Sequence, residues 1–386
     1  MIARNITPKI LEDLSFFPAV AIVGARQVGK TTLARSLQKK IQKESIYLDL
    51  ESEEDAYRLE NAESYLLQHL DKCVVIDEIQ RMPRLFPLLR SLIDRKREPA
   101  RFLLLGSASP ELVKGSSESL AGRIAYTELC PVHLLEIQEQ VSMQMHWLRG
   151  GFPVPLLAPN QTLSTRWQSN FIQTFVERDL RFLGQNISEQ TLTKLLRMLV
   201  SAHSNLLNIS DLSRSLDISQ PAVSRYLDIL EGSFVIQRLM PYFQNIGKRL
   251  VKTPKLYIRD SGLFHNLARI YDFDNLSGHL LVGASWEGYV VEQIREIAYP
   301  DSEMYFYRTQ NGAEADLVLI RPDGTKWCIE IKYSNSPVLS KGFFQSCEDL
   351  KPEKRFVIVP TTESFVRNDG IQVCNLAFFL NQVLSV

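Results

Sequence analysis

A glycine-rich loop between an apolar run and a helical pattern is the feature of this sequence that most restricts its fold. The apolar run Ala19 to Val23 predicts a buried parallel strand, and the loop Gly24 to Thr31 follows it directly. The loop matches G-x-x-x-x-G-K-T at every fixed position, and a helical pattern continues from Thr32 to about Lys40. Strand, loop and helix in this order are the context in which the motif binds phosphate. A chance glycine-bearing turn is the alternative, and it leaves the fixed lysine and threonine unexplained.

The residue types in this loop suit a nucleoside triphosphate with magnesium. Glycines let the backbone approach the phosphates, while the loop amides and the helix N-terminus supply positive potential. Lys30 is placed to reach the β- and γ-phosphates, and the Thr31 hydroxyl is placed to ligate Mg²⁺. We therefore expect ATP and Mg²⁺ as cofactors, with contacts from Gly24, Ala25, Arg26, Gln27, Val28, Gly29, Lys30, Thr31 and Thr32.

A second buried strand supports this interpretation. The run Cys73 to Ile76 is apolar and ends in the acidic pair Asp77 and Glu78, which is the Walker B pattern. We expect Asp77 to hold the magnesium shell and Glu78 to polarise the attacking water. The glutamate predicts ATP hydrolysis rather than binding alone.

Two more residues of the first third are candidates for catalysis. Ser107 ends a third apolar run that starts at Arg101, and it is either a polar sensor near the γ-phosphate or an ordinary strand-end serine. Arg123 is either a finger on the γ-phosphate of a neighbouring subunit or a solvated surface arginine. The first interpretation of Arg123 makes a second copy of the chain a candidate partner.

In their order along the chain, these motifs resemble those of a widespread family of prokaryotic AAA-superfamily ATPases. The shared segments are G-A-R-Q-V-G-K-T-T, V-V-I-D-E-I-Q, L-L-G-S-A-S, S-L-A-G-R, G-G-F-P from Gly150 to Pro153, Glu177 to Asp179, and Lys255 to Leu263. The resemblance covers nearly the whole chain. It implies an AAA-type ATPase followed by a C-terminal half known only as a domain of unknown function, and it implies no particular substrate.

Length and composition limit the remaining possibilities. A chain of 386 residues is too long for one ordinary core, so we expect two to four packed units. Zero formal net charge argues against a surface built wholly for nucleic acid. The five scattered cysteines predict reduced thiols rather than a disulfide framework or zinc site. No run approaches a membrane span, and the apolar stretch 16–25 is better interpreted as a strand than as a signal peptide, so we expect a cytoplasmic protein without membrane contact.

The middle of the chain has a different pattern. After Arg123 the alternation of strand and helix stops, and prolines and glycines punctuate residues 131–165, which predicts loops and short helices. A helical pattern returns from Thr165 to about Leu183, with three core candidates: Phe171, Phe175 and Leu180.

The next segment has the layout of a helix-turn-helix. We expect helices at Thr191 to Ala202, Ser210 to Ser215, and Gln220 to Leu230, the last capped by Ser219. In the third helix we expect Val223, Leu227 and Leu230 to face inward, and Gln220, Ser224, Arg225 and Asp228 to be more exposed. A wing would come from residues 234–239 and from the basic positions Lys248, Arg249, Lys252 and Lys255. Such a module either contacts DNA or serves only for packing.

The last third contains a helix followed by three strands. We expect the helix from Trp286 to about Ala298, the strands at 305–307, 315–320 and 327–331, and a turn at Pro322 to Gly324 that makes the last two strands a hairpin. Asp316 begins one strand of the hairpin. Glu330 and Lys332 lie two residues apart on the other, so they project from one face.

This Asp…Glu-x-Lys arrangement resembles the PD-(D/E)xK nuclease fold. Glu287 matches the additional acidic position of that fold, whereas Ala315 stands where the motif name has proline. The resemblance implies that Asp316 and Glu330 hold a second Mg²⁺ and that Lys332 orients water or offsets phosphate charge. Arg308 and Gln310 are candidates for substrate contact. The site either cleaves nucleic acid or belongs to an inactive binding module.

Together these features predict an α/β protein with four parts. We expect an AAA-type P-loop ATPase domain at residues 1–135, a helical connector or lid at 136–190, a winged-helix-like domain at 191–250 and a PD-(D/E)xK nuclease-like domain at 251–386. The main functional interpretation is an ATPase that couples its nucleotide state to a C-terminal half facing DNA. An ATP-regulated, metal-dependent DNA nuclease and a non-hydrolysing nucleotide switch or scaffold remain as alternatives.

Overall fold

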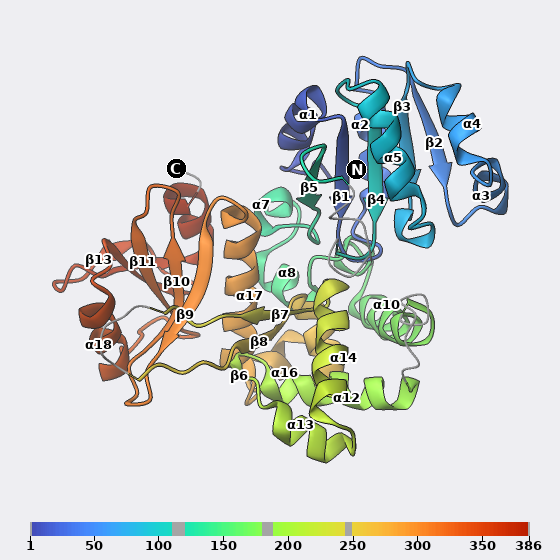
Figure 1. The fold of residues 1–386 in the computed structure, drawn as a ribbon. Helices are drawn as coiled ribbons and strands as arrows, with labels where there is room; N and C mark the ends of the chain where they lie inside the picture. Colours follow the sequence, from blue (N-terminus) through green and yellow to red (C-terminus); the bar gives the residue numbers. More distant parts are fainter. Residues whose placement is uncertain (1, 110–119, 180–187, 244–248, 385–386) are drawn as a thin grey trace. The chain divides into compact units, whose positions relative to one another are not determined.

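The computed structural model describes residues 2–109, 120–179, 188–243 and 249–384 (Figure 1). The chain divides into two compact units. The first unit comprises residues 1–132, 179–185 and 228–235, and the second comprises 133–178, 186–227 and 236–386. Within the described ranges, no helix combines the length and apolar character needed to cross a bilayer.

The first unit is built on a five-stranded sheet with the order β2-β3-β4-β1-β5 and parallel pairing throughout. The strands are β1 (Ala19–Val23), β2 (Ser45–Asp49), β3 (Cys73–Asp77), β4 (Phe102–Gly106) and β5 (Ile124–Glu128). The three apolar runs therefore form strands, as predicted. The expectation that the strand pattern stops after Arg123 was wrong, because β5 starts at the next residue and pairs with β1. Its partly exposed edge position explains why it lacks an apolar run.

Helices cover this sheet and close its core. They are α1 (Thr7–Phe16), α2 (Lys30–Gln38), α3 (Glu53–Arg58), α4 (Ala62–Leu67), the 3-10 turn η1 (Ile79–Arg81) and α5 (Leu85–Arg95). The core combines strand residues such as Ile76 and Leu104 with the buried face of α5, which includes Leu89 and Leu92. Because the strands are parallel, their carboxyl ends share one edge, where ligands of such sheets bind.

The second unit begins with short helices, as the prolines and glycines predicted. They are α7 (Leu134–Ile137), α8 (Met143–Arg149), α9 (Pro153–Leu156) and α10 (Gln161–Thr174), which continues into the π-helix η2 (Phe175–Asp179). The predicted core residues Phe171 and Phe175 are buried, and Leu180 lies outside the described residues.

Among the described residues, three helices and three short strands follow. The elements are α12 (Glu189–Ala202), β6 (Asn205–Leu206), α13 (Ile209–Leu216), α14 (Gln220–Gly232), β7 (Ile236–Leu239) and β8 (Lys255–Ile258). The three strands form an antiparallel sheet with β8 in the centre. Side chains on α14 face as expected: Val223, Leu227 and Leu230 are buried, while Gln220, Arg225 and Asp228 are exposed. The short helices α15 (Ser261–Ala268) and α16 (Phe273–Ser277) follow.

The C-terminal part of the second unit is a six-stranded mixed sheet with the order β13-β14-β12-β11-β10-β9. Its elements are α17 (Val282–Ala298), β9 (Glu303–Arg308), β10 (Glu314–Ile320), β11 (Lys326–Ile331), α18 (Lys341–Leu350), β12 (Lys354–Val359), β13 (Phe365–Val366), β14 (Gln372–Asn375), α19 (Leu376–Phe378) and the π-helix η3 (Phe379–Leu384). The predicted hairpin is present, with Leu317 opposite Ile329. Since α18 returns the chain, β12 runs parallel to β11. The fold is thus α/β, as predicted, with a parallel sheet first and a sheet-rich part last.

Two of the segments shared with the AAA-superfamily family pack against each other in the second unit. Asp260 caps α15 by accepting the Leu263 amide at 2.8 Å, and its other oxygen accepts the Gly151 amide at 2.8 Å. At Gly262, a Cβ would lie 2.1 Å from the carbonyl oxygen of Arg149. The close approach of the two backbones leaves room only for glycine at position 262. The buried carboxylate of Asp260 is needed to accept the two backbone amides.

Candidate functional site

The phosphate-binding loop lies at the carboxyl end of β1 and leads into α2. Gly24 has φ 153°, and a Cβ there would lie 2.2 Å from the carbonyl oxygen of Leu129. Lys30 is 5% exposed, and its ammonium donates to the carbonyls of Gly24 at 2.9 Å and Ala25 at 2.8 Å. The loop therefore folds around its own lysine, and the carbonyl contacts hold the ammonium at the N-terminus of α2.

The other loop positions differ in exposure. Val28 is buried and its carbonyl accepts from Arg4 at 3.1 Å, which ties the loop to the start of the chain. Arg26 forms an ion pair with Glu51 at 3.4 Å. Gln27 and Gly29 both have positive φ. Gln27, Thr31 and Thr32 are exposed at the mouth of the loop.

The Walker B aspartate is directly bonded to the loop. The Thr31 hydroxyl donates to Oδ2 of Asp77 at 2.8 Å, and Asp77 is 4% exposed. The hydroxyl of Tyr47, on β2, donates to the same oxygen. Burial and the charge of Asp77 raise the pKa of Tyr47 above its ordinary value. Tyr47 was missed from the sequence because β2 is a partly buried strand without an apolar run.

The second acidic residue is held in a triangle of side chains. Glu78 adopts the left-handed region with φ 56°, directly after β3. Ser107, directly after β4, donates to Oε2 of Glu78 at 3.0 Å. The side-chain amide of Gln80 donates to the serine hydroxyl at 2.8 Å and also to Oε2 of Glu78. Gln80 ends the motif V-V-I-D-E-I-Q, and its role becomes visible only in the folded chain. Because β4 lies between β3 and β1, Ser107 stands between the acidic pair and the phosphate-binding loop.

Arg123 is engaged within its own chain. Its guanidinium meets the carboxylate of Asp94 through Nε at 2.7 Å and Nη2 at 3.0 Å, and Nη1 donates to the Ala121 carbonyl at 2.9 Å. The hydrogen bonds from Arg123 hold the pKa of Asp94 below its usual value. A finger role for Arg123 would require this exposed pair to open.

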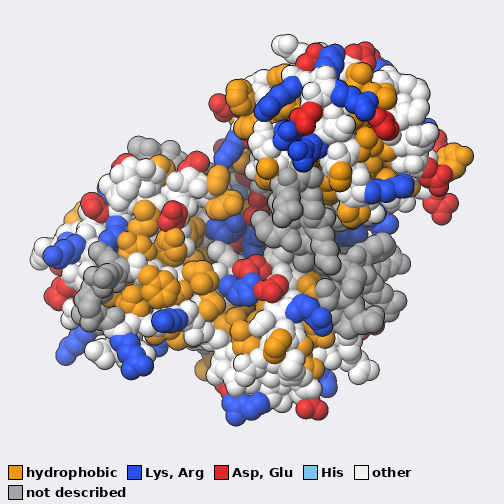
Figure 2. All heavy atoms as spheres, viewed as in Figure 1, with side chains coloured by type: hydrophobic (Ala, Val, Ile, Leu, Met, Phe, Trp, Pro, Cys, Tyr) orange, Lys and Arg blue, Asp and Glu red, His pale blue; other side chains and the backbone are white. Residues whose placement is uncertain are grey.

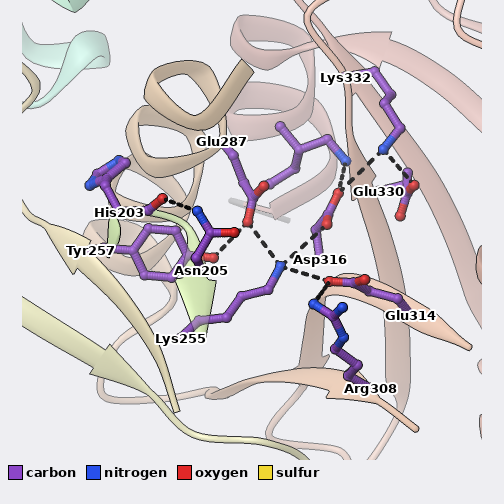
Figure 3. A network of polar contacts seen from close by, with 11 residues as sticks. His203, Asn205, Lys255, Tyr257, Glu287, Arg308, Glu314, Asp316, Glu330 and Lys332 are labelled. Atoms are coloured by element: carbon purple, nitrogen blue, oxygen red, sulfur yellow. Dashed lines mark hydrogen bonds and ion pairs between the residues drawn. The ribbon is translucent and has the colours of Figure 1, made fainter. Parts of the chain in front are cut away.

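The second unit brings the predicted nuclease-like residues together (Figure 3). Glu287 comes from α17, Asp316 from β10, Glu330 from β11, and Lys332 directly after β11. Oδ2 of Asp316 accepts the Ile331 amide at 2.9 Å and lies 3.9 Å from the Lys332 ammonium. A register shift between β9 and β10 at this point re-aims the β10 side chains.

The hairpin carboxylates are buried rather than facing solvent. Asp316 is 7% and Glu330 3% exposed. Oε1 of Glu330 lies 2.7 Å from the Lys332 ammonium, while Oε2 has no hydrogen-bond partner within the part of the chain that the structure describes. Burial and the neighbouring charge of Asp316 raise the pKa of Glu330 to about 8, while the ammonium of Lys332 opposes that rise.

Three residues of this cluster were not assigned to it from the sequence: Lys255, Tyr257 and Glu314. Lys255, expected on a basic wing, is instead 2% exposed and reaches from β8 into the cluster, so its assignment to a DNA-facing wing was wrong. Its ammonium contacts Glu287 at 3.1 Å, Glu314 at 3.2 Å and Asp316 at 3.5 Å. Arg308 contacts Glu314 at 3.5 Å, and Tyr257 donates to Glu287 at 2.7 Å. The other predicted wing positions Arg249 and Lys252 are exposed, as is Gln310, and Lys248 lies outside the described residues.

Three family models match successive parts of the chain. Residues 17–138 match the family model described as an AAA domain. Residues 140–274 and 282–379 match two domains of unknown function, DUF8612 and DUF4143. Two mycobacterial proteins named as uncharacterized, from Mycobacterium bovis and Mycobacterium tuberculosis, are each 39% identical over 368 residues, which is 95% of this chain and 82% of theirs.

The chain belongs to a family of AAA-type P-loop ATPases. Nucleotide binding, usually with Mg²⁺, is what this family implies. Among solved structures, the Walker-type ATPase of Pyrococcus abyssi matches 69% of this chain and 96% of its own, at 15% identity and a TM-score of 0.47.

Proposed function

We propose that this ATPase hydrolyses Mg-ATP at its phosphate-binding loop. The observation that carries the proposal is the 2.8 Å hydrogen bond between the Thr31 hydroxyl and Asp77, because these two groups would share the ligand shell of magnesium. Lys30 would exchange its loop carbonyls for phosphate oxygens. Magnesium, when bound, neutralises charge on the phosphates.

Glu78 is the proposed general base for the attacking water. Its Oε2 is engaged by Ser107 and Gln80, so the carboxylate has to leave these partners, or share them with a water, before it can accept a proton. Ser107 would then act as the sensor, since it connects the end of β4 to the reacting glutamate. Arg123 remains a proposed finger toward a second copy of the chain, released from Asp94 when that copy docks.

Replacing Lys30 by alanine tests the binding step. We expect ATP affinity to fall at least about tenfold, because the variant loses a charged donor to the phosphates. Titration of a fluorescent ATP analogue measures this loss. Lys39→Ala is the matched control, since Lys39 is an exposed lysine at the end of the same helix. Equal affinities for wild type and Lys30→Ala would contradict the assignment of the loop.

We further propose that the second unit faces nucleic acid and responds to the nucleotide state. The order helix, strand, helix, helix, strand, strand from α12 to β8 supports a winged-helix-like domain at 191–250, whose sheet is completed by β8 from just beyond that range. In that arrangement α14 takes the place of the recognition helix. On the face that Figure 2 shows, basic and acidic side chains are interspersed, which favours contact through local elements there over a broad basic surface. The proposed domains on either side are the ATPase at 1–135 with its connector at 136–190, and the nuclease-like domain at 251–386.

Arg225 is the side chain of choice for testing this interface. It is exposed on α14, and Arg225→Ala should weaken binding to duplex DNA and lower the slope of log affinity against log salt by about 1. Fluorescence anisotropy with and without Mg-ATP measures both effects. Arg197→Ala, on α12, serves as an exposed arginine control. Equal losses in the two variants, or no salt-dependent binding by wild type, would count against the interface.

An ATP-regulated DNA nuclease is the second candidate function, because Glu287, Asp316, Glu330 and Lys332 do converge on one site. Cleavage of plasmid DNA in Mg²⁺ or Mn²⁺ that is lost in Asp316→Ala would favour it. A nucleotide switch with a degenerate nuclease-like domain is the third, and absence of ATP turnover in the wild-type protein would favour that one.

A further inference from the structure

The carboxylate cluster of the second unit already contains a cation. The ammonium of Lys255 lies 3.1 Å from Glu287, 3.2 Å from Glu314 and 3.5 Å from Asp316. An ammonium has three N–H donors and no acceptor, and here it donates a hydrogen bond to Glu287 and forms ion pairs with the other two carboxylates. We propose that Lys255 is the resident cation of this cluster, in the position where a nuclease-like site would hold a divalent ion, and that the cluster accepts divalent metal only when this ammonium is removed. The proposal does not depend on the ATPase chemistry.

The lysine is charged in spite of its burial. Burial alone would lower the pKa of Lys255, but the carboxylates of Glu287, Asp316 and Glu314 outweigh it and hold that pKa well above its ordinary value. Conversely, burial raises the pKa of Glu287 and the ammonium opposes that rise. The ammonium of Lys255 and the carboxylate of Glu287 therefore each favour the charged form of the other, as the partners of a buried ion network do.

The ammonium is fixed in place by its backbone. Lys255 starts the central strand of the three-stranded sheet, where it pairs with Leu206 on one side and Leu239 on the other. The carboxylates belong to the helix α17 and to β10 of the six-stranded sheet. The cation and the groups that bind it therefore come from different elements of the fold. The ammonium also lies 5.7 Å from the centroid of the Phe306 ring, and this cation–π contact helps to hold it in place.

A divalent ion and this ammonium exclude each other. Mg²⁺ binds carboxylate oxygens at about 2.0–2.1 Å and requires near-octahedral coordination. An ion bound by Glu287 and Asp316 would lie next to the ammonium that already contacts both oxygens. The two cations would repel each other more strongly in this buried site than the same pair would at the protein surface, because the effective dielectric constant is lower there. The second oxygen of Asp316 is also used, by the Ile331 amide.

Terbium luminescence tests the proposal in the full-length chain. Tyr257 donates to Glu287 at 2.7 Å, so Tb³⁺ bound at this carboxylate would be sensitised by excitation of the tyrosine. Tb³⁺ bound at Asp77 would be sensitised in the same way by Tyr47. All proteins in this experiment therefore carry Asp77→Asn, which removes that carboxylate. With Lys255 or Lys255→Arg present, we expect no saturable signal from the cluster. In Lys255→Ala we expect saturable luminescence that disappears when Asp316→Asn is added.

Thermal unfolding gives a second measurement on the same proteins. The Lys255→Ala protein should melt at a lower temperature in EDTA, because three carboxylates lose their common partner, and Mn²⁺ should raise its melting temperature by binding the folded state. Mn²⁺ should not shift the protein that retains Lys255. If Lys255→Ala does not fold, Lys255→Gln keeps the stem of the side chain without its charge and enters the same comparison.

Two results would overturn the proposal. One is saturable luminescence with Lys255 intact that is lost on Asp316→Asn, because metal and ammonium would then coexist. The other is a folded Lys255→Ala or Lys255→Gln protein that binds no Tb³⁺, because the carboxylates would then not form a cation site. ATP turnover measured without Asp77→Asn reports on the nucleotide site separately, so failure of the two proposals can be distinguished.

Discussion

Replacing Glu78 by glutamine should lower ATP turnover at least about a hundredfold while ATP binding is retained. The amide keeps the size of the side chain and can still contact Ser107 and Gln80, but it cannot accept a proton from water. Lys30, Thr31 and Asp77, which would hold the nucleotide and its magnesium, are unchanged in this variant. Phosphate release under saturating Mg-ATP, together with titration of a fluorescent ATP analogue, measures the two effects separately.

The matched control for this experiment is Glu63→Gln. Glu63 is an exposed glutamate of the same unit that pairs with Arg95 at 2.8 Å, and its loss should leave turnover unchanged. Ser107→Ala should have an intermediate effect, since it removes one hydrogen bond to Glu78 and leaves the carboxylate in place. Wild-type turnover in Glu78→Gln would remove Glu78 from its proposed role, and loss of ATP binding would assign it to the binding site.

The N-terminal site was predictable because its determinants are local in the sequence. The segment Ala19 to Thr31 contains the strand, the phosphate-binding loop and the start of the helix in one continuous stretch. Asp77 was found from its strand in the same way. Tyr47 and Gln80 were not, because their partners become visible only when β2 is paired with β3 and β4 is placed beside it. The edge strand β2 is only partly buried, so it lacks the continuous apolar run from which a buried strand is predicted.

The C-terminal cluster was predictable in part, for the same physical reason. The alternation of side chains along a hairpin places Asp316 and Glu330 near each other, and the predicted hairpin is present. Lys255 precedes Glu287 by 32 residues and lies on β8, whereas Glu287 lies on the helix α17, so no spacing rule connects them. The wing was predicted from the spacing of four basic residues, Lys248, Arg249, Lys252 and Lys255, and Arg249 and Lys252 are indeed exposed. Only the tertiary fold shows that the last basic residue of this segment is buried among carboxylates.

The contact between α15 and the end of α8 gives a second strong prediction, this time for stability. Replacing Gly262 by alanine should lower the free energy of unfolding of the second unit by about 3 kcal/mol. The added Cβ would lie 2.1 Å from the carbonyl oxygen and 2.5 Å from the carbonyl carbon of Arg149, and backbone atoms cannot move aside as a flexible side chain can. That carbonyl also accepts from Gln168 at 2.9 Å, so moving it strains a buried hydrogen bond.

Gly283→Ala is the matched control, because it makes the same chemical change in a helix without the clash. Gly283 lies in the first turn of α17, is exposed, and has no atom within 4 Å of an added Cβ. Alanine there should be neutral or stabilise by up to about 1 kcal/mol, since it favours the helix over glycine. Urea unfolding followed by circular dichroism measures both variants. If Gly262→Ala unfolds like Gly283→Ala, α15 and the end of α8 are not in close backbone contact. The packing of the G-G-F-P segment against the segment around Asp260 would then need another explanation.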